Sequence, residues 1–288
     1  MQSIVHSFFD QATYTFSHVV HDPLSKQCAI IDSVLDFDYA SGTTSYTSAN
    51  KILDFVDTAQ LNVKWILETH VHADHLSAAP YLQTKTGGCI GIGADVKVVQ
   101  ETFSKAFNAQ MEMRCEGEQF GKLFTDNESI LLGNIKGVAV HTPGHTPACM
   151  TYVFGNAAFV GDTLFMPDFG TARCDFPGGD AAVLYRSIQK IFTLAEHTRL
   201  FMCHDYKAPG REEYACETSV SEQREHNIHV HQGISEDAFV GMRSQRDSTL
   251  KMPQLILPSV QVNIRAGHLP PPEDNGQTFL KVPVNFFI

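Results

Sequence analysis

Basic residues are scarce in this chain. Its 288 residues include 21 Lys and Arg against 32 Asp and Glu, which gives a formal net charge of -11. Proteins bind nucleic acid largely because Lys and Arg displace the counterions condensed on the phosphate backbone. The acidic balance therefore argues against nucleic acid as a partner.

The sequence also lacks the segments that direct a protein into a membrane or out of the cell. No apolar run approaches the roughly 18 residues that indicate a membrane span. The first basic residue is Lys26, so the basic start of a secretory signal is missing. We therefore expect no membrane partner and a cytoplasmic location.

Paired cysteines are absent as well. The seven Cys are an odd number, are widely spread and form no C-x-x-C pair. This pattern favours reduced thiols packed in the interior over a disulfide framework.

Histidine, by contrast, is abundant, with 14 residues, and many of them follow short β-type runs. The hydrophobic pattern predicts strands that alternate with polar loops and helices, which is typical of a layered α/β architecture. We expect a β-hairpin or meander in 1–31, helices at 49–61, 76–83 (interrupted by Pro80) and 181–194, and strands at 63–67, 89–92, 138–140, 152–154, 157–160 and 200–203.

The C-terminal part has a different character. From about Ser244 onward, prolines punctuate short apolar runs, which predicts an irregular extension. We therefore divide the chain into a catalytic domain, 1–243, and an extension, 244–288, that packs on this domain or on a second subunit.

One polar loop concentrates groups that bind metals. His70, His72, Asp74 and His75 follow the predicted strand 63–67 within six positions. On a continuing strand they could not all point to one side. If the strand ends near Thr69 and a helix starts near Asp74, a good N-cap residue, all four side chains can converge. Imidazole and carboxylate ligands together suit Zn, Fe or Mn.

Three further strand ends carry ligands of the same kind. His145 lies in a Pro-Gly turn, Asp162 follows Gly161 at the end of a strand, and His204 follows Cys203. A coincidence of four such strand ends is hard to reconcile with ordinary core or surface histidines. The sequence therefore predicts a metal centre at one edge of the sheets.

These motifs, H-V-H-A-D-H at 70–75, T-P-G-H-T at 142–146, G-D-T-L-F at 161–165 and C-H-D-Y at 203–206, resemble the metallo-β-lactamase superfamily over roughly residues 10–210. The resemblance implies an αββα sandwich, two mixed sheets flanked by helices. In two-metal hydrolases of this family, the positions matching His70, His72 and His145 hold one ion. Those matching Asp74, His75 and His204 hold the second, and the position matching Asp162 bridges the two.

The segment 168–176 and the H-D-Y at 204–206 further resemble the persulfide dioxygenase branch and the β-lactamase-hydrolase-like proteins. That branch implies a single Fe(II) bound by His70, His145 and Asp162, a facial triad with open positions. His72, Asp74, His75 and His204 then orient the ligands. The implied reaction oxidises glutathione persulfide with O2 to sulfite and glutathione.

The same resemblance implies substrate contacts at Arg173, for a glutathione carboxylate, and at Tyr206. A homodimer is expected by the habit of the family. Two other interpretations stay open: a hydrolase of a glutathione thioester or a lactone with two Zn ions, and a metal-dependent binding or sensor protein. The cluster His226, His229 and His231 is interpreted as a solvated helix face.

Overall fold

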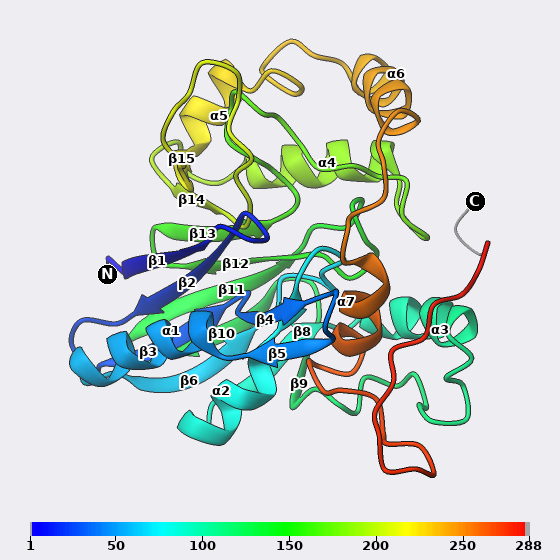
Figure 1. The fold of residues 1–288 in the computed structure, drawn as a ribbon. Coiled ribbons are helices and arrows are strands. Elements are labelled where there is room, and N and C mark those ends of the chain that lie inside the picture. Colours follow the sequence, from blue (N-terminus) through cyan, green and yellow to red (C-terminus); the bar gives the residue numbers. More distant parts are fainter. Residues whose placement is uncertain (1, 286–288) are drawn as a thin grey trace.

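Two six-stranded sheets lie face to face at the centre of the protein (Figure 1). The computed structural model describes residues 2–285. The strands of the first sheet, in spatial order, are β1 (Ile4–Asp10), β2 (Thr15–His21), β3 (Gln27–Ile31), β6 (Asn62–Leu67), β8 (Cys89–Gly93) and β9 (Lys122–Phe124). The sheet is mixed, because β3 pairs antiparallel with β2 and parallel with β6.

The second sheet is also mixed. Its strands, in spatial order, are β10 (Glu128–Leu132), β11 (Ile135–His141), β12 (Met150–Phe154), β13 (Ala157–Gly161), β14 (Arg199–Met202) and β15 (Glu217–Ser219). The β13 and β14 strands run parallel, and the other neighbours are antiparallel. A small third sheet contains β5 (Thr43–Ser45), β4 (Val34–Asp38) and β7 (Leu76–Ser77).

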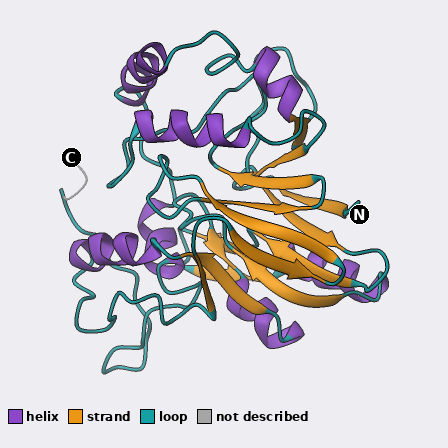
Figure 2. Cartoon of the chain, turned by 180° about the vertical axis from the view of Figure 1, so that it is seen from behind, coloured by secondary structure: helices purple, strands orange, loops and turns teal. Residues whose placement is uncertain are grey.

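Helices cover the outer faces of both large sheets (Figure 2). The helices on the side of the first sheet are α1 (Thr47–Thr58), α2 (Ala79–Thr86), α3 (Val96–Ala106) and α7 (Ile256–Asn263). Those on the side of the second are α4 (Ala181–Ile191), α5 (Val220–His226) and α6 (Glu236–Asp247). The predicted αββα sandwich is thus confirmed.

Strand alternation explains why the sandwich has three apolar layers. On β3, Cys28 and Ile30 point to the layer beneath α1 and α2, whereas Ala29 and Ile31 point between the sheets. Successive side chains of a strand face opposite sides, so a strand of continuous apolar residues feeds both layers. The region between the sheets is filled largely by aromatic and β-branched residues of both.

Two expectations about the chain after β6 were wrong. No helix begins near Asp74: residues 70–75 form an irregular turn, a two-residue strand follows, and α2 begins only at Ala79. Pro80 does not interrupt this helix, because it lies in the first turn, where a missing N–H leaves no hydrogen bond unmade. Gly87 ends the helix at a φ of 75°.

The C-terminal extension is less irregular than predicted. Its helix α7 is buried, and Ile256, Val260 and Val262 belong to the same apolar cluster as the first sheet. The extension thus packs on the body of this chain, and α6 runs across the expected boundary at residue 243. Among residues 2–285, no helix combines the length and apolarity needed to cross a bilayer.

Candidate metal centre

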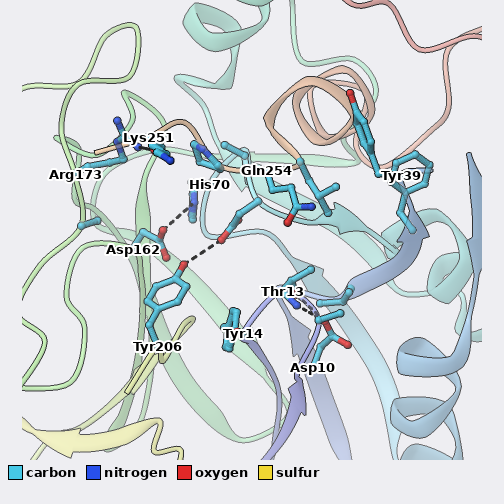
Figure 3. A pocket seen from close by; sticks show the side chains of 18 of the residues that line it. Asp10, Thr13, Tyr14, Tyr39, His70, Asp162, Arg173, Tyr206, Lys251 and Gln254 are labelled. Atoms are coloured by element: carbon cyan, nitrogen blue, oxygen red, sulfur yellow. Dashed lines mark hydrogen bonds and ion pairs between the residues drawn. The ribbon is translucent and has the colours of Figure 1, made fainter. Parts of the chain in front are cut away.

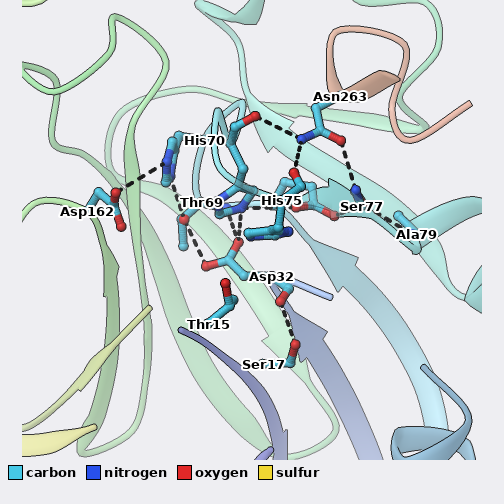
Figure 4. Close-up of polar contacts among 12 residues, drawn as sticks. Thr15, Ser17, Asp32, Thr69, His70, His75, Ser77, Ala79, Asp162 and Asn263 are labelled. Atoms are coloured by element: carbon cyan, nitrogen blue, oxygen red, sulfur yellow. Dashed lines mark hydrogen bonds and ion pairs between the residues drawn. The ribbon is translucent and has the colours of Figure 1, made fainter. Parts of the chain in front are cut away.

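Four strand ends meet at one edge of the sandwich and place their polar residues together. Figure 4 shows His70 and His75 from one of these strand ends and Asp162 from another. The turn at 70–75 follows β6, and His145 follows β11. Asp162 directly follows β13, and His204 comes two residues after the end of β14. The convergence arises because the parallel pairs β3–β6 and β13–β14 direct their carboxyl ends to the same edge.

His70, His145 and Asp162 form one compact group. Their ligand atoms lie within 4.8 Å of one another. The Oδ2 atom of Asp162 is 3.9 Å from His70 Nε2 and 3.7 Å from His145 Nε2. These two imidazoles and one carboxylate are the donor set of a facial triad for iron.

A second group lies beside the first. It contains His72, His75, Cys203 and His204, again with ligand atoms within 4.8 Å. His204 Nε2 lies 3.5 Å from Asp162 Oδ1 and 3.0 Å from Asp74 Oδ2. Asp162 therefore faces both groups, one oxygen to each, which is the position of a bridging ligand.

Each histidine ring is oriented by its other nitrogen. His145 Nδ1 donates to the Arg173 carbonyl at 2.7 Å, and His75 Nδ1 lies 3.2 Å from the Leu76 carbonyl. His70 Nδ1 lies 3.0 Å from Thr69 Oγ1, whose own proton is donated to Asp32. Partners of this kind fix the tautomer that leaves Nε2 unprotonated and free to bind a cation.

Several buried polar atoms that face the centre make no hydrogen bond. They are His70 Nε2, His72 Nδ1, His75 Nε2, His204 Nε2 and Asp162 Oδ1. Buried polar groups are rarely left without such a partner, and a convergent set of lone pairs is suited to a metal ion. The residues present therefore fit one or two divalent metals, and the predicted metal-binding character is supported.

Two carboxylates beneath the centre were missed in the sequence. Asp32 Oδ1 accepts from the Thr69 amide at 2.7 Å and lies 3.0 Å from His72 Nε2, while Glu68 Oε2 lies 3.3 Å from the same nitrogen. Asp32 adopts a φ of 53°, in the left-handed region. The available signal was an Asp directly after strand 27–31, the pattern that singled out Asp162.

Burial sets the protonation of these groups. It lowers the pKa of His70 well below its usual value, helped by the neighbouring imidazoles, and lowers that of His75 to about 3. Burial opposes a charge on His72, but Asp32 and Glu68 raise its pKa well above the usual value. Burial also raises the pKa of Asp162. His70 and His75 are therefore neutral near pH 7, the form that binds metals.

A cavity of about 1040 Å³ opens onto the centre (Figure 3). Of the predicted ligands, His70, Asp74, His145 and Asp162 line it, whereas His72, His75 and His204 are fully buried behind them. Its other walls come from the loop after β1, the β4–β5 hairpin, the segment 165–176 and residues 243–255. This volume is in the range of small-molecule sites.

Both predicted substrate residues line this cavity, but Arg173 does not present a free guanidinium. Its Nε and Nη2 atoms donate to the two carboxylate oxygens of Asp175 at 2.5 and 2.6 Å, and Nη1 donates to the Lys251 carbonyl at 2.6 Å. The Tyr206 hydroxyl lies 3.4 Å from Asp74 Oδ2. The Tyr206 hydroxyl therefore lies beside the metal centre, whereas the guanidinium of Arg173 is already hydrogen-bonded within the protein.

The extension supplies one residue that holds the ligand turn. Asn263 Nδ2 donates to the carbonyls of His72 at 2.9 Å and His75 at 2.7 Å, and its Oδ1 accepts from the Ser77 amide at 2.8 Å. These three bonds, all buried, replace those that an irregular turn cannot make with itself. No motif in the sequence pointed to Asn263.

The histidines at 226, 229 and 231 do not share a helix face, contrary to our interpretation. Helix α5 ends at His226, which is exposed, and His229 lies beyond it with only 9% of its surface accessible. His229 Nδ1 accepts from the Thr171 amide at 3.1 Å. Burial lowers the pKa of His229 to about 4, so the ring is neutral and supports the cavity wall.

Comparison with known proteins agrees with this geometry. The model of the metallo-beta-lactamase superfamily matches residues 12–204. The chain is 55% identical, over 98% of its length and 99% of the other's, to a probable metallo-hydrolase of Burkholderia pseudomallei strain 1710b. It is 47% identical to glyoxylase B2 of Dictyostelium discoideum, over 93% and 92% of the two chains.

Persulfide dioxygenases are more distant relatives. The mitochondrial persulfide dioxygenase ETHE1 of Bos taurus is 28% identical over 93% of this chain and 91% of its own. The crystal structure of ETHE1 from Myxococcus xanthus superposes with a TM-score of 0.72 at 27% identity, covering 92% of this chain and all of the other.

The αββα sandwich with His and Asp ligands at one edge defines a metal-dependent enzyme fold. This chain belongs to the metallo-β-lactamase superfamily. Within it, the resemblance to ETHE1 in sequence and structure supports the persulfide dioxygenase branch.

Proposed function

We propose that this protein is an Fe(II)-dependent persulfide dioxygenase that converts glutathione persulfide, O2 and water to sulfite and glutathione. The observation that carries the proposal is the division of the ligands. The triad His70, His145 and Asp162 faces the cavity, whereas the remaining three histidines are sealed behind it. A single ion held by this triad would be accessible from the side where a substrate enters.

Two residues beside the triad, His72 and Asp74, contact protein partners of their own, while His72 Nδ1, His75 Nε2 and His204 Nε2 make no hydrogen bond, so these contacts are compatible with one ion or with two. His72 Nε2 lies against Asp32 and Glu68, and Asp74 lies between His204 and Tyr206. In the proposed enzyme these residues orient the triad and hold the water needed by the reaction. Iron, when bound, supplies the activation of O2 and the electrophilic contact for the persulfide sulfur.

The protein's own groups arrange the reactants around this centre. Phe165, Phe169 and Phe176 line the cavity, and the Phe176 ring packs against His145 of the triad. Tyr206 packs against Phe165 and Phe169, with its hydroxyl directed to Asp74. In the proposed enzyme the substrate lies with its sulfur next to the triad and its peptide along the rest of the cavity, which removes the need for a productive collision in solution.

A hydrolase with two metals is the second candidate, and one observation favours it. Asp162 directs Oδ2 to His70 and His145 and Oδ1 to His204, which is the arrangement of a bridging carboxylate. The resemblance to glyoxylase B2 also supports this candidate. Two Zn ions would polarise a glutathione thioester or lactone carbonyl and activate water.

The decisive experiment begins with metal analysis of freshly purified protein. The dioxygenase proposal predicts one iron per chain, O2 consumption on addition of glutathione persulfide, and equimolar sulfite. Two zinc ions per chain, with S-lactoylglutathione cleaved under nitrogen and no O2 uptake from the persulfide, would establish the hydrolase instead.

His204→Ala separates the two functions within one protein. For the dioxygenase, this change leaves the triad intact, so iron content is expected to stay near one and O2 consumption to fall by about 10- to 100-fold. For the hydrolase, one of two metals is expected to be lost. Wild-type protein prepared in parallel gives the reference stoichiometry.

A further inference from the structure

Four basic side chains line the cavity, and two of them are already neutralised. Arg173 is paired with Asp175, and Arg243, only 1% exposed, is paired with Asp247 through Nη2 at 2.6 Å. Arg246 and Lys251 also line the cavity, and among residues 2–285 neither forms a salt bridge with an acidic side chain. These two are therefore the cations available to a ligand.

Lys251 is fixed close to the metal centre by a short chain of bonds. His145 donates to the carbonyl of Arg173, and the Arg173 guanidinium donates to the carbonyl of Lys251. Figure 3 shows Arg173 and Lys251 on the same wall, beside His70 and Asp162. Two hydrogen bonds thus connect the backbone of Lys251, through Arg173, to the candidate metal ligand His145. The ammonium group of Lys251 forms no salt bridge with a described residue.

The rest of the cavity repels anions. Its lining includes five carboxylates, at Asp10, Asp36, Asp38, Asp74 and Asp162, and the chain as a whole carries a net charge of -11. Away from the metal centre, a negatively charged group of the substrate therefore meets a favourable potential along the wall formed by residues 246–251. Glutathione and its persulfide carry two carboxylates and need such a partner.

We propose that Lys251, assisted by Arg246, binds a carboxylate of the substrate, and that Arg173 is a positioning residue that holds Lys251 in place. The inference rests on the proposed function for the identity of the substrate. The carboxylate contact that was predicted for Arg173 is thereby assigned to Lys251 in the C-terminal segment. The ammonium group of Lys251 acts there as a point charge on a flexible stem.

Binding of S-methylglutathione, which carries both carboxylates but cannot react, tests the inference by isothermal calorimetry. We expect Lys251→Met to raise the Kd about fivefold, as for a partly solvated ion pair, and Arg246→Met to raise it less. Lys251→Arg is expected to restore binding. The matched control is Lys51→Met, at an exposed lysine of α1 outside the cavity.

The diethyl ester of S-methylglutathione identifies the charge as the cause. If Lys251 binds a carboxylate, Lys251→Met weakens the acid but not the ester, and added salt weakens acid binding in the wild type. The inference is overturned if Lys251→Met binds the acid as Lys51→Met does, if it weakens acid and ester equally, or if the wild type does not bind the acid.

These measurements are independent of turnover. If S-methylglutathione binds through Lys251 but the persulfide causes no O2 uptake, the dioxygenase proposal fails and the binding residue stands. If O2 uptake occurs and Lys251→Met leaves both the Kd and the KM unchanged, the dioxygenase proposal stands and the assignment of Lys251 fails.

Discussion

The ligand loops and the C-terminal segment 244–268 are adjoining parts of one site but are built in different ways. The ligand loops continue from sheet strands, and each of their histidines is oriented by a buried partner such as Thr69 or Asp32. The segment contains the last turn of α6 and the short helix α7, and it contacts the site through side chains of an irregular stretch, including Lys251, and through Asn263 of α7.

The difference separates two requirements of an enzyme. A metal centre needs ligands fixed to a fraction of an ångström, which the ends of paired strands provide. Substrate recognition tolerates a looser wall, because a charged side chain on a flexible stem can reach its partner from several backbone positions. Changes in the two regions should therefore have effects of different size and kind.

The largest effect on activity is expected at Asp162, which faces both groups of candidate metal ligands. Loss of a supporting residue around a metal costs about 10- to 100-fold, so Asp162→Ala should lower turnover by more than about 100-fold. Metal content measured by plasma emission spectrometry should fall together with the rate. Asp54→Asn, at an exposed position of α1, serves as control, and full metal content in Asp162→Ala would contradict the assignment.

Asp32→Asn tests whether the support of the ligand loops matters as much as we argue. Asp32 accepts from Thr69 and contacts His72, so its loss is expected to weaken metal binding by about 10- to 100-fold. Competition with a chromophoric chelator measures this affinity. Unchanged affinity would show that Glu68 alone suffices to orient His72.

Asn263→Leu breaks the connection between the two regions. It leaves the carbonyls of His72 and His75 and the amide of Ser77 without partners. We expect the free energy of unfolding to fall by about 3 kcal/mol, measured by urea denaturation of the metal-loaded protein. Asn263→Asp keeps the acceptor for Ser77 but turns a buried carboxylate oxygen toward the two carbonyls, so it should lose at least as much. Equal stability of both variants and wild type would show that Asn263 does not stabilise the ligand turn.

The smallest effect concerns the pH dependence of the cavity wall. The pKa of His229 is lowered by burial to about 4 from an ordinary value near 6.5. The unfolded chain therefore binds more protons between these values, and the stabilisation is complete above pH 6.5 and lost as the pH falls toward 4. His229→Gln should flatten this part of the stability profile in thermal unfolding, and an unchanged slope would contradict it.

Much of the site could be predicted from the sequence, because ligands follow strands whose hydrophobic pattern is plain. His70, His145 and Asp162 each come after such a run, and parallel pairing brings strand ends together. The local path of the 70–75 turn could not be predicted in this way. Its shape depends on Asn263, which is distant in sequence and carries no motif.

Arg173 is a second residue whose contacts could not be predicted from the sequence. Its contact with a glutathione carboxylate was predicted from the resemblance. The sequence does not reveal that its guanidinium is already hydrogen-bonded to Asp175 and to the Lys251 carbonyl. An ion pair is a property of geometry, since a change of a few ångströms decides whether a charge is free or neutralised.

The sequence by itself determined the family, the layered fold and the histidines and Asp162 that meet at the edge of the sheets, because strand periodicity and ligand spacing are local properties of the chain. Only the tertiary structure decided which ligands face the cavity, which carboxylates stand behind them and which cations remain free. Those outcomes depend on contacts between segments more than 70 residues apart, such as Arg173 with Lys251, and such contacts are set by packing of the whole chain.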